Sequence, residues 1–422
     1  MTLSRRRFTT LTGAAVVAPA IGLGRNASAA GARVVIIGGG FGGATAARYI
    51  KRWDSAIDVT LIEPATTFVT CPFSNLVLGG VKKIGDITHS YDGLVGLGVK
   101  VIHAKAESIN IEKKWVHLPN EQIAKYDRLI VSPGIDFRWD EVEGYDEAAS
   151  RLAPHAWKAG VQTLLLREQL QAMPDGGTFV ISPPANPFRC PPGPAERVSM
   201  VAHYFKTTKP KSKILVLDPK GGFSKEGLFT AAWKELYPGM IDYRKTEDGK
   251  VVRVDAENKT LHTEFDEIKG DVVNFIPPQY AAAIARDAGL ADASGWCPVD
   301  QKSFASTLAK DVFVIGDASI ASPMPKSGFS ANNQGKVVAA AVVSNLQGRE
   351  IADPKLANTC YSLVAPDYGI SVSAVYRLNN GKLEAVEGAG GLSPKEAGMR
   401  QRQLEASYAE GWYRSITDEM FA

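Results

Sequence analysis

The stretch from Ala32 to Gly43, ARVVIIGGGFGG, constrains the fold more than any other part of the chain. Four apolar residues precede a glycine cluster, and the residues that follow, ATAARYIKRW, have helical spacing. This order of buried strand, tight turn and helix predicts the start of a βαβ unit. Gly38, Gly40 and Gly43 match the dinucleotide-binding fingerprint, in which one glycine permits the turn, one admits a pyrophosphate and one lets the helix pack on the strand.

An acidic residue at the end of the next predicted strand supports this interpretation. The segment DVTLIE ends at Glu63, twenty residues after Gly43, where a carboxylate can bind a ribose hydroxyl. The predicted helix would direct its N-terminal N–H groups and its partial positive charge toward the phosphates. A glycine-rich turn alone is weak evidence, but strand, helix and acid together predict dinucleotide binding.

The residues before this strand predict an export signal. A twin-arginine pattern spans Ser4 to Phe8, an uncharged stretch runs from Thr9 to Gly24, and Ala27-Ser28-Ala29 is a small-residue cleavage site. A disordered basic N-terminus is the alternative, but it would not need these three parts in order. We therefore expect a twin-arginine signal peptide over residues 1–29. That route exports folded proteins, so a cofactor inserted in the cytoplasm would travel to the periplasm inside the protein.

Removal of the signal changes the charge balance. The chain has 48 Lys and Arg against 45 Asp and Glu, and residues 1–29 hold four of the arginines and no acid. The mature chain is therefore close to −1 and lacks a basic stripe with interleaved aromatic residues, so we expect no nucleic-acid partner. No later segment reaches about 18 consecutive apolar residues, so we expect no membrane span. The remaining length predicts two or three domains.

Cys71 is the most informative residue of the next segment, TTFVTCPFSNLVL. Eight extended residues separate it from Glu63 and span up to about 26 Å, enough to follow a flavin dinucleotide from its adenosine ribose to its isoalloxazine end. We therefore include Thr70 and Cys71 among the candidate cofactor residues. Farther on, Tyr126-Asp127 and the turn Ser132-Pro133-Gly134 resemble the second FAD-contact motif of flavoproteins with two dinucleotide-binding folds.

A second strand and turn, GGTFVISPP, lies where NAD(P)H-using relatives would have another glycine loop. Here the chain continues into Pro183 to Pro187, and proline both lacks the N–H group that would bind a pyrophosphate and fixes φ. A further strand, KILVLD, ends at Asp218, so the βαβ outline remains without a nicotinamide site. We therefore expect that the electrons neither come from nor go to NAD(P)H.

The segment FRCPPGPAE replaces that loop. Cys190 lies in a stiff proline frame at the expected top of a sheet, and Glu196 follows six residues later, where a helix begins. This arrangement suits a positioned redox or nucleophilic site, and a structural half-cystine explains the spacing equally well.

The chain has four cysteines and no histidine pair with metal-ligand spacing. Two structural disulfides could form in three pairings, but a chain with an ample core needs neither for stability, which favours chemical roles. We expect no metal site, and we interpret His89, His103 and His117 as structural or exposed.

A later strand, Phe313 to Asp317, ends in Gly316-Asp317. In FAD enzymes of this type the aspartate contacts the ribityl chain. The segment PKSGFS, which contains Lys326, precedes a helix predicted over Asn332 to Leu346, whose positive end could stabilise charge on a reduced flavin. Paired with the N-terminal fingerprint, the Gly-Asp motif favours FAD over NAD.

These motifs give the chain a family resemblance over nearly its full length. It resembles the flavoprotein subunit of flavocytochrome c sulfide dehydrogenase. The matching motifs are VVIIGGGFGGATAARYIK, VTLIEPATTFVTC, PHAWKAG, PPANPFRCPPGPAERVS, GWCPVD, VIGDASIASPMPKSGFSANNQGKVVAAAVV, NTCYSLVAPDYGISV and GWYRSI. The resemblance implies an α/β flavoprotein of the glutathione reductase type, with two dinucleotide-binding domains and a C-terminal interface domain.

The resemblance also implies roles for individual residues. FAD would be tethered through the Cys71 sulfur to its 8α-methyl carbon, and a redox disulfide between Cys190 and Cys360 would lie above the flavin. Glu196 would be a candidate acid/base beside that disulfide, and Trp412 would lie close to the flavin. Cys297 receives no role and is interpreted as a small buried core residue.

From these motifs we expect four parts of the chain. Residues 30–145 and 295–350 would form the FAD-binding domain, and residues 146–294 would form a second Rossmann-like domain without an NAD(P) glycine loop. Residues 351–422 would form the interface domain, and residues 1–29 are the signal.

The activity implied is oxidation of sulfide to polysulfide or zero-valent sulfur through Cys190, Cys360 and FAD. The chain contains no CxxCH motif, so a c-type haem would have to lie on a separate cytochrome subunit, in a periplasmic heterodimer.

Three alternatives stay open. A membrane-associated sulfide:quinone oxidoreductase would share the flavin and the cysteines, but the C-terminal sequence is too polar for an amphipathic anchor. An NADH-dependent disulfide or persulfide reductase is disfavoured by the proline turn. The third alternative is a non-catalytic FAD-binding interaction protein whose cysteines only staple the fold.

Overall fold

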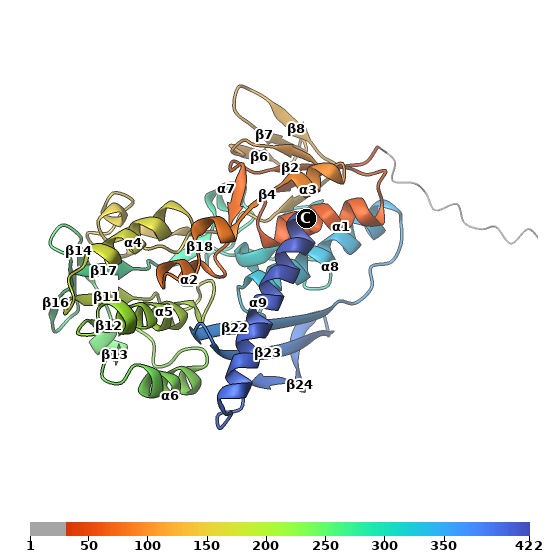
Figure 1. The fold of residues 1–422 in the computed structure, drawn as a ribbon. Helices are drawn as coiled ribbons and strands as arrows, with labels where there is room; N and C mark the ends of the chain where they lie inside the picture. The colour runs from red at the N-terminus through yellow and green to blue at the C-terminus, as the bar shows by residue number, and fades with distance from the viewer. Residues whose placement is uncertain (1–30) are drawn as a thin grey trace, which may run out of the picture.

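The computed structural model describes residues 31–422, and the predicted signal peptide lies outside the described residues. Two parallel sheets and one long antiparallel sheet organise the described chain (Figure 1). Helices connect the parallel strands, so the predicted α/β fold class is confirmed.

The first parallel sheet has the strand order β20-β9-β1-β2-β5. The apolar residues of β1 are at most 5% exposed, as a strand covered on both faces requires. Helices α1 and α8 pack closely against each other, because Gly42 and Gly335 leave no side chains between them. The bounds are β1 Arg33–Ile37, β2 Asp58–Ile62, β5 Lys100–Ile102, β9 Arg128–Val131, β20 Val312–Val314, α1 Phe41–Trp53 and α8 Gly328–Leu346.

The second parallel sheet has the order β13-β12-β11-β17 and lies on the other side of the molecule (Figure 1). Its bounds and those of its helices are β11 Thr178–Ser182, β12 Lys213–Asp218, β13 Ile241–Lys245, β17 Val272–Phe275, α4 Val161–Ala172, α5 Gly193–Thr208 and α6 Glu226–Leu236. Both predicted βαβ outlines are therefore present.

Small sheets and short helices connect these two units. Strand β10 pairs with β18, although the sequence assigns residues 279–281 to the second domain, and the predicted domain limits stay a prediction. The elements are β3 Thr67–Val69, β4 Thr88–Ser90, β6 Ser108–Asn110, β7 Trp115–His117, β8 Ile123–Lys125, β10 Ile135–Phe137, β14 Arg253–Asp255, β15 Thr260–His262, β16 Glu267–Lys269, β18 Gln279–Ala281, β19 Cys297–Pro298, β21 Ser319–Ile320, α2 Ser74–Leu78, α3 Asp92–Gly96 and α7 Ala283–Asp287; 3₁₀ turns span Ile84–Ile87, Trp139–Glu141, Ala149–Arg151, Thr246–Gly249 and Gly316–Ala318.

The C-terminal region is an antiparallel sheet crossed by one long helix. The sheet is formed by β22 Lys355–Ala365, β23 Tyr368–Asn379 and β24 Lys382–Leu392, and the helix is α9 Met399–Phe421. Strand β22 contacts both α5 of the second unit and α8 of the first. Helix α9 crosses the sheet and ends against α1 and α3 (Figure 1). The C-terminal region therefore joins the two parallel sheets.

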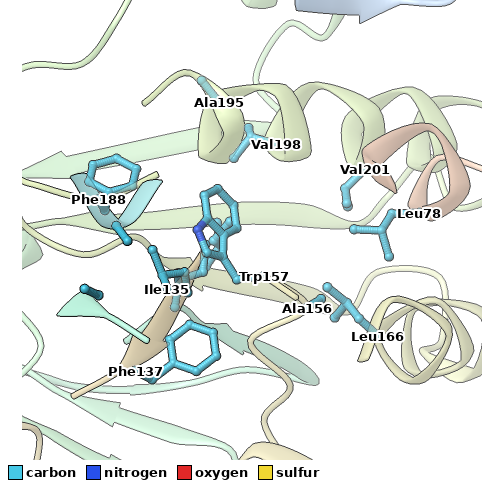
Figure 2. Close-up of a cluster of buried hydrophobic side chains, with 14 of the residues drawn as sticks. Leu78, Ile135, Phe137, Ala156, Trp157, Leu166, Phe188, Ala195, Val198 and Val201 are labelled. Carbon is cyan, nitrogen blue, oxygen red and sulfur yellow. The ribbon is translucent and has the colours of Figure 1, made fainter. Parts of the chain in front are cut away.

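A buried cluster fills the space between α4, α5 and β10. Figure 2 shows the Trp157 ring in its middle, with Ile135 and Phe137 on one side and Ala195 and Val198 of α5 on the other. Trp157 is 5% exposed. This packing fixes the position of the start of α5, which follows Cys190.

Helix α8 begins at Gly328, four residues before the predicted start. The reason is a cap: the Ser327 hydroxyl accepts a hydrogen bond from the Ser330 N–H group at 3.0 Å, so the serine-rich segment forms the first turn. Among residues 31–422, no helix combines the length and apolar character needed to cross a bilayer.

Candidate functional site

The glycine loop of the first sheet has the geometry that the fingerprint predicts. Gly38 has a φ of +95°, and a Cβ atom there would lie 2.2 Å from the Ser132 carbonyl oxygen. A Cβ atom on Gly43 would lie 1.9 Å from the Gly38 carbonyl oxygen. Both glycines are therefore required by the turn itself, and Gly40 precedes the first residue of α1.

The N-terminus of α1 is suited to bind an anion. No side chain caps it, and its first turn contains no acidic residue, so its N–H groups are free to face a phosphate. Glu63 follows β2 and accepts hydrogen bonds from the N–H groups of Gly39, at 2.8 Å, and Ala65, at 3.0 Å. The structure thus brings Glu63 to the glycine loop, as its spacing predicts.

The Gly-Asp motif lies at the end of β20. Gly316 has a φ of +72°, and its N–H group donates to the Gln334 side chain at 2.7 Å. The Asp317 carboxylate lies 3.9 Å from the Arg189 guanidinium, and burial raises the pKa of this carboxyl group. The motif therefore contacts the segment that carries Cys190 as well as α8.

Lys326 fixes the loop between β20 and α8. Its ammonium group donates to the carbonyl oxygens of Asp317, at 2.7 Å, and Ser319, at 2.9 Å, and lies 3.8 Å from the centre of the Trp296 ring. Burial lowers the pKa of Lys326 to about 8. Two of its three donors are used within the protein, which leaves one for a bound group.

Thr70 and Cys71 follow β3 and have different surroundings. The Thr70 hydroxyl is fully buried, 2.8 Å from the Tyr413 hydroxyl and 2.9 Å from the Pro72 carbonyl oxygen, so it fixes the chain to α9. The Cys71 sulfur is half-buried, 3.5 Å from the Trp157 carbonyl oxygen. Of these two predicted cofactor residues, Cys71 has the side chain free for a bond to a cofactor.

One cavity brings together residues from four distant segments. It has a volume of about 70 Å³, which admits several water-sized molecules because one needs roughly 10 to 15 Å³. Cys190, Glu196, Cys360 and Trp412 all line it. Its other walls are mostly apolar: Pro72, Phe73, Asn75, Leu76, Pro192, Met200, Ser327, Gly328, Phe329, Thr359, Tyr361 and Leu363.

Cys190 and Cys360 reach this cavity from different units. Cys190 precedes α5 with a φ of +58°, and its N–H group donates to the Lys326 carbonyl oxygen at 2.7 Å. Cys360 lies in the middle of β22. All four cysteines are free thiols in this structure, so the expected bridge between Cys190 and Cys360 is not formed here, and their pairing stays a prediction. Cys297 is fully buried in the core.

Glu196 is placed in the first turn of α5. Its carboxyl group accepts a hydrogen bond from the Ser362 hydroxyl. Burial raises its pKa, and the nearby Lys225 ammonium opposes that shift. A carboxyl group in this environment can hold a proton at a higher pH than an exposed one, which suits an acid/base.

Three polar residues of the site have no assignment from the sequence. Asn358 and Ser362 lie two positions from Cys360 on either side and therefore share its face of β22, so the alternation of a strand could have found them. Lys225 comes from the loop before α6, and nothing in its local sequence indicates that it reaches β22.

Trp412 of α9 stacks on Phe329, with ring centres 6.3 Å apart and planes 7° from parallel. Its indole Nε1 is buried and has no hydrogen-bond partner within residues 31–422. A bound group with an acceptor atom would satisfy it. The free N–H groups at α1, the steric demand at Gly38 and Gly43 and this indole together fit a flavin dinucleotide.

The turn of the second sheet does not offer a comparable cradle. Asp218, at the end of β12, is 1% exposed. It pairs with Lys220 at 2.7 Å and accepts a hydrogen bond from the Tyr243 hydroxyl. Its oxygens are therefore used by neighbouring side chains. In residues 31–422, no group of three metal-ligating side chains is placed to hold an ion.

Comparison with protein families gives three matches. Residues 163–277 match the central domain of the "Sulfide dehydrogenase [flavocytochrome c] flavoprotein chain". Residues 352–421 match "Flavocytochrome c sulphide dehydrogenase, flavin-binding", and residues 32–163 match "Pyridine nucleotide-disulphide oxidoreductase".

Individual relatives point in the same direction. The flavoprotein chain of flavocytochrome c sulfide dehydrogenase from Chlorobaculum thiosulfatiphilum is 64% identical over 45 residues, which are 11% of this chain and 94% of that sequence. The mitochondrial sulfide:quinone oxidoreductase of Mus musculus is 22% identical over 67% of this chain. That match spans 65% of the mouse protein, slightly less than two thirds of its length.

Among solved structures, the sulfide:quinone oxidoreductase of Aquifex aeolicus has a TM-score of 0.71, with 18% identity over 92% of each chain. This likeness supports the fold of a flavin-dependent oxidoreductase.

Proposed function

The chain belongs to the family of flavocytochrome c sulfide dehydrogenase flavoprotein chains, and from this premise we propose that it oxidises sulfide at Cys190 and Cys360. In this proposal FAD receives the electrons and passes them to a c-type cytochrome. The observation that carries the proposal is the shared cavity of Cys190, Cys360 and Glu196. Its volume suits a small anion such as hydrosulfide.

The first step is a thiol–disulfide exchange in the oxidised enzyme. Hydrosulfide attacks the Cys190 sulfur, a new S–S bond forms, and the bond between Cys190 and Cys360 breaks. The electron pair of the broken bond leaves on Cys360 as a thiolate, and Cys190 carries the persulfide. A second hydrosulfide attacks the outer sulfur of the persulfide and releases it as a short polysulfide, so both cysteines end reduced.

The surrounding side chains handle protons and water. The raised pKa of Glu196 allows its carboxylate to take the proton of an entering hydrosulfide or persulfide. Phe73, Phe329 and Trp412 line the cavity and limit the entry of bulk water.

Residues of the first sheet would hold the FAD. Gly38, Gly40 and Gly43 would admit its pyrophosphate, Glu63 would bind the adenosine ribose, and Gly316-Asp317 would lie along the ribityl chain. Lys326 and Trp412 would contact the flavin end, and Thr70 would fix the strand that presents Cys71. When bound, the flavin would supply a two-electron acceptor that can release single electrons to a haem.

We propose that Cys71 tethers this FAD covalently, since its half-buried thiol follows the strand after the glycine loop. Denaturing gel electrophoresis should give a fluorescent band at the mass of the protein. In the Cys71→Ser variant the fluorescence should run with free flavin, whereas in Cys297→Ser it should stay with the protein. A fluorescent protein band in Cys71→Ser would refute the tether.

The acceptor in this proposal is a separate cytochrome subunit in the periplasm. The chain has no CxxCH motif for a haem of its own, and its N-terminal residues have the pattern of a twin-arginine signal. We propose a heterodimer of this chain with a c-type cytochrome.

The test is anaerobic titration with sulfide, followed by the flavin absorbance near 450 nm. The wild-type protein should bleach, and Cys190→Ser and Cys360→Ser should bleach at least about 100-fold more slowly, because neither retains the exchange reaction. Cys297→Ser is the matched control and should bleach at the wild-type rate. Undiminished bleaching in Cys190→Ser would contradict the proposal and favour a flavin-binding interaction protein.

A second candidate, sulfide:quinone oxidoreductase, is favoured by the mouse and Aquifex matches. The buried side chains of α9, such as Tyr413 and Phe421, are used against the protein, which argues against a membrane anchor there. With sulfide as donor, reduction of a c-type cytochrome rather than of a short-chain quinone is expected. The opposite preference would assign the second candidate.

A further inference from the structure

The two cysteines of the cavity have unequal electrostatic surroundings. On β22, the side chains of Asn358, Cys360 and Ser362 share one face of the strand. Donor groups converge on this face from the loop before α6 and from the start of α8. The corresponding donors are missing around Cys190 within the described residues.

Lys225 is the charged group of this arrangement. Its residue is 5% exposed, and its ammonium donates to the Cys360 carbonyl oxygen at 2.7 Å and to the Ser362 hydroxyl. Because an ammonium can only donate, the Ser362 hydroxyl must turn its own hydrogen toward Glu196, where a hydrogen bond is present. The chain Lys225–Ser362–Glu196 therefore has a fixed direction.

Asn358 supplies a second donor, aimed at the sulfur itself. Its Nδ2 lies 3.2 Å from the Cys360 sulfur. The hydroxyl groups of Ser327 and Ser330 donate to its Oδ1, at 2.6 and 3.1 Å. These two bonds fix the amide so that its N–H group, and not its oxygen, faces the sulfur.

Cys190 has the opposite environment. Burial raises the pKa of its thiol, and Glu196, Cys360 and Cys71 raise it further, while Arg189 is the group that lowers it. At Cys360 burial also raises the pKa, but Lys225 and Asn358 both oppose the shift. The groups facing Lys225 from other elements include Glu196 and, from α9, Glu405.

We propose that Lys225 and Asn358 are positioning residues that direct the negative charge of the cysteine pair to Cys360, so that the incoming sulfur is bound by Cys190. The proposal rests on the proposed sulfide chemistry and specifies its direction. In thiol–disulfide exchange the sulfur that better carries negative charge is the better leaving group. Hydrosulfide therefore forms its bond to Cys190, and the electron pair of the broken S–S bond goes to Cys360.

The test measures each thiolate directly. The holoprotein is reduced to the dithiol form and treated with iodoacetamide over a range of pH, and alkylation at each cysteine is quantified by peptide mass spectrometry. In the wild type Cys360 should react with a midpoint at lower pH than Cys190, by at least about one unit, which is about tenfold in thiolate at a given pH.

Lys225→Met should shift the Cys360 midpoint upward and leave less than about a threefold preference between the two sulfurs. Lys220→Met is the matched control, because it also removes a buried lysine from the second unit, and it should leave the preference unchanged. Asn358→Asp can still accept from the two serines but has no donor for the sulfur, so it should also remove the preference. It provides the test if Lys225→Met does not fold.

A wild-type protein in which Cys190 has the lower midpoint would overturn the proposal, as would an unchanged preference in both Lys225→Met and Asn358→Asp. Alkylation needs neither sulfide nor an electron acceptor. Its result is therefore independent of the sulfide titration, and a failure of the proposed function would be recognised by bleaching that is lost or unaffected by cysteine replacement.

Discussion

The β1–α1 turn and the β11–α5 turn follow equivalent buried strands and then diverge. In the first, Gly38, Gly39 and Gly40 connect strand and helix, and the helix begins without a cap or an acid. In the second, ten residues separate Ser182 from Gly193, several of them proline, and the helix carries Glu196 in its first turn. The first end therefore attracts a phosphate, and the second presents a carboxyl group and a cysteine instead.

The ends of the neighbouring strands differ in the same way. Glu63 after β2 bonds only backbone N–H groups of nearby residues. Asp218 after β12 is paired with Lys220, whose ammonium also donates to the Pro184 carbonyl oxygen at 2.8 Å. One βαβ frame thus keeps a nucleotide cradle, while the other is filled by its own side chains and carries a candidate site for sulfur chemistry.

The largest expected effect concerns the first turn. Gly43→Ala places a Cβ atom 1.9 Å from the Gly38 carbonyl oxygen, so the loop must move, at a cost of about 1 to 3 kcal/mol or more. The flavin content of the purified protein, measured as the 450 to 280 nm absorbance ratio, should fall at least about fivefold. Gly85→Ala is the control, because a Cβ atom there meets nothing within 4 Å. Full flavin content in Gly43→Ala would remove the distinction between the two turns.

The next prediction concerns the filled acid of the second unit. Asp218→Asn leaves the buried Lys220 ammonium without its charged partner, so the free energy of unfolding should fall by about 3 kcal/mol. Urea denaturation measures this change. Asp242→Asn, at an exposed acid on the adjacent strand, should change stability by less than about 0.5 kcal/mol. If Asp218→Asn is as stable as the wild type, Asp218 is a free acid like that of a nucleotide-binding unit.

The smallest effect tests a device that both units share. Asp127, before β9, accepts the Arg33 N–H group at the start of β1, and Asp271, before β17, accepts the Thr178 N–H group at the start of β11. The Arg33 side chain also bonds Asp127 and lowers the pKa of that carboxyl group. Asp127→Asn should therefore cost about 1 kcal/mol, and Asp271→Asn about half as much.

The pH dependence gives the sign of this effect. A carboxyl group whose pKa is lowered on folding stabilises the protein above its ordinary pKa of about 3.9, and that stability is lost as the pH falls through the lowered value. The difference between the wild type and Asp127→Asn should be constant near neutral pH and shrink in acid. A difference that grows in acid would contradict the assigned ion pair.

The sequence predicted those features that depend on local pattern. The glycine loop, Glu63 at its edge and both parallel sheets follow from apolar runs, glycine positions and strand ends, which short stretches determine. The start of α8 was predicted four residues late, because Ser327 as a cap depends on one hydrogen bond rather than on periodicity.

The grouping of the site could be predicted only in part. The resemblance brought Cys190, Cys360 and Glu196 together, but the Lys225 contact joins residues 135 positions apart through the packing of α6 on β22. Thr70 was predicted from its place beside Cys71, and its hydroxyl instead meets Tyr413, from a helix at the other end of the chain. Such contacts depend on tertiary packing, which no local pattern encodes.

The account depends on the flavin being reduced from the cysteine cavity and not through the second nucleotide-like unit. The direct measurement is to mix one anaerobic preparation separately with sulfide and with NADH, and to follow the flavin absorbance near 450 nm. Sulfide should bleach the flavin, and NADH should leave its spectrum unchanged at any concentration. Saturable bleaching by NADH, with none by sulfide, would contradict the account.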